Sequence, residues 1–146
     1  MLSMPIQVLI SKTYNMKNFS FDEAMSFAYG STLLTGGSSI AVNGDNEYYI
    51  PKQGYVVGGI VPENSCEMGD VSAFKSLYNH LFFQADLEVG QTGSAIIGTW
   101  VEDGKIVFDL CNVLDGKHEA LELAEMRGER AIYDLEEKRE IFVNNQ

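Results

Sequence analysis

The chain has few of the residues that brace small proteins through covalent bonds or metals. Its 146 residues include only two cysteines, two histidines and three prolines. Cys66 and Cys111 belong to no Cys-x-x-Cys pair and have no neighbouring histidine, which excludes the usual zinc-binding patterns and a disulfide framework. We therefore expect one domain stabilised by its own hydrophobic core, without a metal or cofactor, in a reducing compartment.

Long apolar runs are also missing, and the first ten residues lack a basic leader. A helix that spans a bilayer needs about 20 predominantly apolar residues. These absences predict a cytoplasmic protein without a membrane partner, located in the host cell cytoplasm if a virus encodes it.

Basic residues are the third scarcity, with ten Lys and Arg against 21 Asp and Glu and a formal charge of −11. This charge opposes binding to phosphate backbones and anionic lipids, so we expect no direct contact with nucleic acid. The charge balance is −5 for residues 1–93, −2 for 94–114 and −4 for 115–146. Because no segment is dense in acids, the pattern favours an ordinary solvated surface over a DNA mimic.

What the sequence does contain is a strong hairpin signal. Asp103-Gly104 separates the apolar segments 96–102 and 105–110 and favours a two-residue type I′ turn. Such a turn pairs Glu102 with Lys105 and thereby fixes every other pair. One face of the hairpin is then predicted to be core, and its residues are Ile97, Thr99, Val101, Ile106, Phe108 and Leu110.

The opposite face of this hairpin combines an aromatic ring, a carboxylate and a position without a side chain. Trp100 and Asp109 lie near Gly98 in the predicted register. An aromatic plane beside a hydrogen-bond acceptor, with space left by a glycine, is suited to a flat ligand. The competing interpretation is that a helix covers Trp100 and that Asp109 caps a neighbouring turn.

Two further segments are candidate ligand contacts. A glycine-serine stretch can present amides and hydroxyls to a phosphate, or can be a plain flexible connection, and its residues are Gly36, Gly37, Ser38 and Ser39. Tyr55 can line a pocket together with Tyr48 and Tyr49. Strands also use aromatic residues simply for cross-strand packing, which is the alternative for these tyrosines.

The rest of the pattern predicts an α+β fold. Helices are expected after three capping residues, from Ser20 with Glu23 to near Gly30, from Asp70 through Phe82, and from Asp115 over 116–127 with Gly128 as the stop. Segments 62–69 and 86–93 are predicted to be connections. Further strands are expected at 6–10, 40–43, 47–50, 55–61, 131–135 and, after a turn, 141–143.

These elements predict a single α+β domain over residues 1–146, with a largely antiparallel sheet of about six or seven strands and three helices. Exposed edge strands also favour a homo-oligomer, without indicating its stoichiometry.

Motifs for catalysis are absent. The sequence has no Gly-x-Ser-x-Gly elbow and no His-Glu-x-x-His helix, and its two histidines, His80 and His118, fall on different predicted helices. We therefore predict no catalytic residues and favour a binding protein over an enzyme.

The carboxy-terminal third resembles small uncharacterised proteins and domains of phages and other mobile elements. The resemblance rests on the pattern Gly98-Thr99-Trp100, Gly104, Phe108-Asp109-Leu110, Glu119-Ala120 and Ala131-Ile132-Tyr133-Asp134. It implies a context of host-defence evasion, and it implies no catalytic residues.

Three functions follow as hypotheses. The first is sequestration of a small nucleotide-like ligand, with Trp100 or a tyrosine stacked on the base and residues 36–39 at the phosphate. The alternative is an acidic protein that inhibits a host protein, with Glu119, Glu122 and Glu125 as an acidic ridge. The third is a metal-dependent nucleotide hydrolase that uses Asp109 and another acid.

Overall fold

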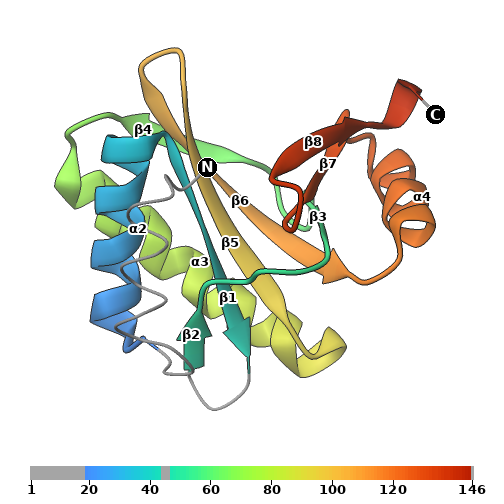
Figure 1. Cartoon of the computed structure of the whole chain (residues 1–146). Helices are drawn as coiled ribbons and strands as arrows, with labels where there is room; N and C mark the ends of the chain where they lie inside the picture. The colour runs from blue at the N-terminus through green and yellow to red at the C-terminus, as the bar shows by residue number, and fades with distance from the viewer. Residues whose placement is uncertain (1–18, 44–46, 146) are drawn as a thin grey trace.

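A computed structural model describes residues 19–43 and 47–145 of the chain. Within these residues it contains three α-helices and eight strands, which form one mixed α+β domain with an antiparallel sheet (Figure 1). The helices are α2 (Phe21–Thr35), α3 (Val71–Thr92) and α4 (Lys117–Arg127). The strands are β1 (Gly37–Asn43), β2 (Glu47–Tyr49), β3 (Tyr55–Val57), β4 (Asn64–Glu67), β5 (Ala95–Glu102), β6 (Lys105–Leu114), β7 (Ala131–Asp134) and β8 (Arg139–Phe142), followed by the 3₁₀-helix η1 (Val143–Asn145).

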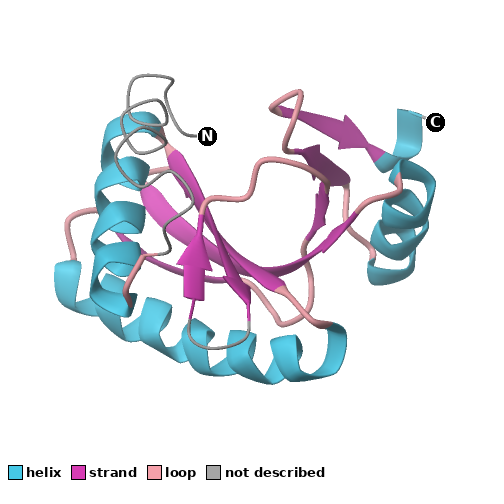
Figure 2. Cartoon of the chain, turned by 60° about the horizontal axis from the view of Figure 1, so that its bottom comes forward, coloured by secondary structure: helices cyan, strands magenta, loops and turns pink. Residues whose placement is uncertain are grey.

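The sheet is strongly curved. Its strands follow the order β2-β1-β5-β6-β3-β7-β8, and β4 pairs with β6 outside this path. Figure 2 shows the strands bent into a U, with the three helices on its outer, convex side. We call α2, α3 and strands β1, β2, β4, β5 and β6 the major half, and α4 with β3, β7 and β8 the minor half.

Strand β6 joins the two halves because it changes partner along its length. Its residues 105–111 pair with β5 on one side. On the other side, Lys105–Phe108 pairs with β4, and Asn112–Leu114 pairs with β3. The short section around Asp109 has neither partner there, and the chain crosses this gap between β3 and β4.

The predicted hairpin is confirmed in its turn and register. Asp103 and Gly104 have φ angles of 52° and 78°, as the type I′ turn requires. Glu102 pairs with Lys105, and Gly98 pairs with Asp109. The predicted core face points to the convex side, where four of its residues join the main hydrophobic cluster: Ile97, Ile106, Phe108 and Leu110.

The main core lies between the sheet and helices α2 and α3. Phe108 contacts the rings of Phe74 and Tyr78, with ring-centroid distances of 5.1 and 6.4 Å. A smaller core lies under α4, and its buried side chains are all aliphatic: Val57, Ala120, Ala124, Ile132 and Ile141. Aromatic rings supply more buried area per residue, so the major half contributes most of the hydrophobic stabilisation.

Two of the three predicted helix caps are confirmed. Ser20 and Glu23 form the reciprocal capping box of α2, and Asp70 accepts a hydrogen bond from the Ala73 amide at the start of α3. The prediction for α4 is wrong at its start. Its N-cap is Gly116 and no side chain caps it, so Asp115 lies outside the helix. Gly128 ends α4 in the left-handed conformation, as predicted.

Two helices are longer than the sequence predicted. Helix α2 continues through Gly30 to Thr35, and α3 includes most of the expected connection 86–93 before it ends at the C-cap Gly93. Neither Gly30 nor Gly90 meets a heavy atom within 4 Å of a Cβ placed there. Packing of the flanking turns on the sheet therefore overrides the weak helix propensity of these glycines.

The strand predictions were right in type and less accurate in extent. The 40–43 and 47–50 segments pair as predicted, although β1 begins at Gly37, and the return strand β8 pairs with β7. Segment 55–61 is a strand only to Val57, and the expected loop 62–69 contains β4. The predicted strand 6–10 lies outside the described residues.

None of the helices in the described part of the chain is long and apolar enough to cross a membrane.

Candidate functional site

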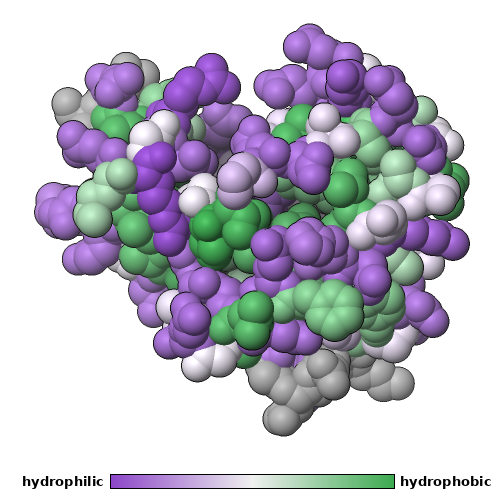
Figure 3. Space-filling model, turned by 180° about the vertical axis from the view of Figure 1, so that it is seen from behind, coloured by the Kyte–Doolittle hydropathy of each residue, from purple (hydrophilic) through white to green (hydrophobic). Residues whose placement is uncertain are grey.

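A cleft of about 560 Å³ lies on the concave side of the sheet, between the two halves. Its floor comes from β1, β5 and β6, and its opposite wall comes from the segment 128–133 and from β8. The space-filling view in Figure 3 shows a notch between the halves with mostly hydrophilic rims. The volume falls within the range of small-molecule sites, about 300–1,000 Å³.

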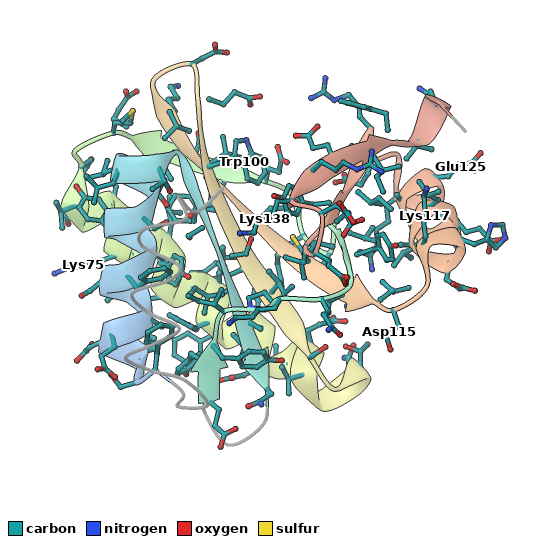
Figure 4. The ribbon with its side chains drawn as sticks, in the orientation of Figure 1. Lys75, Trp100, Asp115, Lys117, Glu125 and Lys138 are labelled. Atoms are coloured by element: carbon teal, nitrogen blue, oxygen red, sulfur yellow. The ribbon has the colours of Figure 1, made fainter. Side chains whose placement is uncertain are left out.

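Trp100 stands on the major-half side of this cleft. Figure 4 shows its side chain pointing from β5 toward the side of the sheet that carries β7 and β8. The ring is partly exposed, since α2 and α3 cover the other face of β5. Gly37 is the pairing partner of Trp100 on β1, and Gly98 precedes it on the same face of β5. Because these glycines have no side chains, the cleft beside the indole is left open.

Asp109 lies deeper in the cleft and is only 4% exposed. It projects at the gap in the pairing of β6, where its Oδ1 accepts a hydrogen bond of 3.3 Å from the Gly59 amide. The pKa of Asp109 is raised to about 6, mainly by burial and also by the nearby Glu129 and Glu63, while the bonds from Gly59 and Cys111 oppose the rise. The carboxylate therefore changes charge close to neutral pH.

The chain that crosses the gap requires glycine at positions 58 and 59. A Cβ on Gly58 would collide with Oδ2 of Asp109 and would lie 2.9 Å from Oε1 of Glu129. Gly59 adopts φ 89°, which a residue with a side chain rarely does. The Gly58-Gly59 pair thus lets the backbone pass directly over the two carboxylates.

Arg127 of α4 holds this glycine segment in place. Its guanidinium donates hydrogen bonds to the carbonyl oxygens of Val57 (3.4 Å) and Gly58 (3.0 Å) and to Oδ1 of Asn112 (2.6 Å). Asn112 in turn donates to Glu88 of α3 at 3.0 Å. One partly buried polar chain therefore connects α4, β3, β6 and α3 behind the cleft.

Carboxylates dominate the charge of the cleft. Five acidic residues line it, with Arg130 as the one basic lining residue among the described positions: Glu63, Glu102, Asp109, Glu129 and Glu140. In the described part of the chain, none of these acids has a salt bridge, because the two that occur join Lys105 to Glu67 and His118 to Glu122. Burial raises the pKa of Glu63, and Glu129 and Glu102 raise it further.

Cys111 and Tyr133 add two neutral polar groups to the lining. Burial raises the pKa of the Cys111 thiol well above its ordinary value, and Asp109 and Glu129 act in the same direction. Burial also raises the pKa of Tyr133 to about 12, and its hydroxyl oxygen is buried without a hydrogen-bond partner in the structure. Both groups therefore carry their protons at neutral pH, and the tyrosine oxygen is closed off from solvent.

The structure brings four of the seven candidate residues to this cleft: Trp100, Asp109, Ser38 and Ser39. Gly36, Gly37 and Tyr55 do not line it. Gly36 is the C-cap of α2, and Tyr55 belongs to β3 and packs against the small core. The glycine-serine stretch is strand rather than flexible connection from Gly37 onward.

The serine hydroxyls expected at a phosphate have a different environment. Oγ of Ser38 lies 2.5 Å from Oγ1 of Thr99, which is 2.7 Å from Oγ1 of Thr32 on α2. This buried hydroxyl chain lies under α2, so Ser38 borders the cleft without offering its hydroxyl to it. Ser39 points to the concave side, opposite Gly98.

Sequence reasoning missed the wall that faces Trp100. Glu129, Tyr133 and Glu140 come from the segment after α4, and Glu63 comes from the expected loop. The sequence signal that could have indicated this region is the Gly58-Gly59 pair, because glycines within a strand often mark a close approach of the backbone to another group.

The described residues contain no group of three or more His, Cys, Asp or Glu side chains arranged to hold a metal ion. Comparisons of the chain with models of protein families, with curated proteins and with solved structures found no match.

Proposed function

We propose that this protein binds a small, flat ligand in the concave cleft and sequesters it without converting it. The observation that carries the proposal is the convergence of Trp100, Asp109 and Ser39, which lie up to 70 residues apart, on one cleft of about 560 Å³. The indole supplies an aromatic plane, and Asp109 supplies a buried acceptor.

The ligand is recognised through its ring system in this proposal. Nucleotide-like molecules fit through their base, which can stack on Trp100 and donate amino hydrogens to the carboxylates. Phosphate groups meet an unfavourable field, because five acids and one arginine line the cleft. We therefore place any phosphate of such a ligand outside the cleft, and not at residues 36–39.

The resemblance to proteins of phages and mobile elements adds a biological context to the proposal. In that context, a non-catalytic binder that removes a signalling molecule of the host would serve defence evasion. Base-containing signals of the host are therefore included among the ligands to test.

Calorimetry and thermal shift assays with adenosine, guanosine, cytidine, cyclic nucleotides and ADP-ribose test the proposal. We expect at least one base-containing compound to bind, with nucleosides ahead of their phosphorylated forms. Trp100→Ala should weaken that binding by about tenfold, because one stacked base contributes about 1–3 kcal/mol. Glu125→Gln on the outer surface of α4 is the matched control and should bind like the wild type (Figure 4). Absence of heat and of a thermal shift across the panel contradicts the proposal.

A second candidate function uses the surface of α4. Glu119, Glu122 and Glu125 are exposed on this helix, so they can contact a basic site on a protein partner. The ridge is interrupted, however, since His118 pairs with Glu122 at 2.7 Å. Reversal of all three charges to Lys should abolish capture of such a partner, and unchanged capture would contradict this function.

A further inference from the structure

The charges of the cleft restrict the class of ligand beyond flatness. This step rests on the proposed function, and it concerns the net charge of the bound molecule. Three features bear on it: the buried Asp109, the second carboxylate of Glu129, and the aromatic side chain of Trp100.

Asp109 and Glu129 form a pair of carboxylates on one side of the cleft. Both reach the space that a side chain on Gly58 would occupy. Two like charges in a poorly solvated place repel each other, and a positive ligand would remove that repulsion. Within the described residues no lysine or arginine forms a salt bridge with either of them.

In the described part of the chain, neither nearby arginine forms a salt bridge with this pair. Arg127 directs its guanidinium to the side chain of Asn112 and to the carbonyl oxygens of Val57 and Gly58. Arg130 lines the cleft and lowers the pKa of Glu63, the acid on the opposite loop. The carboxylates nearest to Gly58 thus keep acceptor positions for a ligand.

A metal ion is a poor match for these acids. The described residues contain no group of three or more ligating side chains with suitable geometry. The lining also includes the aromatic ring of Trp100. A cation that has a flat apolar part and several N–H donors uses all of these features, because aromatic faces attract organic cations and carboxylates accept paired N–H bonds.

We propose that the cleft binds a planar organic cation of the amidinium or guanidinium class, with its N–H groups on Asp109 and Glu129 and its plane against Trp100. The positive charge is what distinguishes this ligand from other flat molecules.

Benzamidine and benzamide are the probes for this inference, because they have nearly the same shape and differ in charge at pH 7.5. Isothermal titration should show binding of benzamidine at least about tenfold tighter than binding of benzamide, since a charge-assisted bidentate pair is the stronger contact. Equal affinities, or tighter binding of benzamide, would overturn the inference.

Variants of the two carboxylates test their separate roles. Asp109→Asn and Glu129→Gln should each weaken benzamidine binding by about tenfold and weaken benzamide binding less, so that the preference for the cation shrinks. Glu125→Gln, an exposed change on α4, should alter neither affinity. Circular dichroism and the unfolding midpoint establish that each variant is folded, and Glu129→Gln keeps the test valid if Asp109→Asn does not fold. Full benzamidine affinity in both folded variants would overturn the inference.

The affinity should also depend on pH, because a proton competes with the cation at Asp109. With a pKa of about 6 for Asp109, only about a tenth of the carboxylate is ionised at pH 5, so benzamidine should bind about tenfold more weakly than at pH 7.5. The titratable groups that act on this carboxylate are Glu129, Glu63 and Cys111, and Arg127 acts on the neighbouring Cys111. A pH-independent affinity in the wild type would contradict the proposed contact.

Failure of this inference and failure of the proposed function give different results. If neutral heterocycles bind and benzamidine does not, the cleft is a ligand site, and the inference that its ligand is positively charged is wrong. If benzamidine, benzamide and the nucleoside panel all fail to bind, both proposals fall.

Discussion

The two halves of the sheet differ in what their side chains do. The major half buries a cluster of aromatic rings between two long helices and the sheet, and Phe74, Tyr78 and Phe108 are at most 1% exposed. The minor half has a small aliphatic core under α4 and places charged residues along the cleft. The comparison teaches that stability is concentrated in one half, whereas both halves supply acids to the candidate site, with Asp109 from the major half and Glu129 and Glu140 from the minor half.

Strand β6 contains this contrast within its ten residues. Phe108 faces the aromatic core, and the next residue, Asp109, faces the cleft. Because successive side chains of a strand point to opposite faces, one strand can stabilise the fold with one face and hold a buried carboxylate on the other. Packing of β6 in the major half offsets the free energy that is lost when this carboxylate is buried.

The largest expected effect comes from the aromatic core. Phe108→Ala should lower the free energy of unfolding by about 3–5 kcal/mol, since it removes a buried ring and leaves a cavity. Phe83→Ala on α3 is the matched control, and because Phe83 is 67% exposed it should cost less than about 1 kcal/mol. Urea unfolding followed by circular dichroism measures both, and similar losses would contradict the assignment of stability to this core.

The next effect concerns the buried carboxylate and depends on pH. The pKa of Asp109 is raised to about 6 in the folded state and is about 3.9 in an unfolded chain, so protonation favours folding. This contribution is fully present below pH 4 and is lost as the pH rises through 6, a change of about 2–3 kcal/mol. Asp109→Asn imitates the neutral form and should be more stable than the wild type at pH 8 and similar to it at pH 4.

Urea titrations at pH 4, 5, 6, 7 and 8 measure this difference, with the fluorescence of Trp100, the single tryptophan of the chain, as the probe. Asp115→Asn is the control at an exposed acid and should reproduce the wild-type profile. A constant difference between Asp109→Asn and the wild type across the series would show that burial does not disfavour the charged form of Asp109.

A smaller effect should separate the halves. Arg127→Gln removes charge-assisted hydrogen bonds to Val57, Gly58 and Asn112 and should cost about 1–3 kcal/mol. Hydrogen exchange should speed up in β3 and α4 and remain slow in β1 and β5, because the lost contacts belong to the minor half. The exposed Arg139→Gln on β8 is the control. Equal acceleration in both halves would mean that they open together.

The sequence predicted the major half better than the minor half, and the reason is local. The Asp103-Gly104 turn fixes the hairpin register by itself, and Ser20 and Asp70 cap helices through residues three positions away. Such signals need no knowledge of distant contacts. Convergence of Trp100 and Asp109 follows from the same register.

The missed parts depend on contacts between distant segments. Strand β4 has three polar residues among its four and forms because β6 offers an edge, so alternation alone does not reveal it. Glu63 and Glu129 reach the cleft only because the chain crosses β6 at Gly58-Gly59 and α4 packs behind that crossing. In the sequence, nothing distinguishes these two glutamates from ordinary glutamates on a protein surface.

The smallest expected effect compares helix starts in the two halves. Ser20→Ala removes the capping box of α2 in the major half and should cost about 1 kcal/mol. Asp115 precedes α4 in the minor half, where Gly116 is the N-cap and no side chain accepts a hydrogen bond from the first turn. Asp115→Ala should therefore lower the free energy of unfolding by less than about 0.5 kcal/mol. Denaturant unfolding of the two alanine variants distinguishes them. If Asp115→Ala costs as much as Ser20→Ala, the aspartate caps α4 in solution, and the two halves begin their helices by the same means.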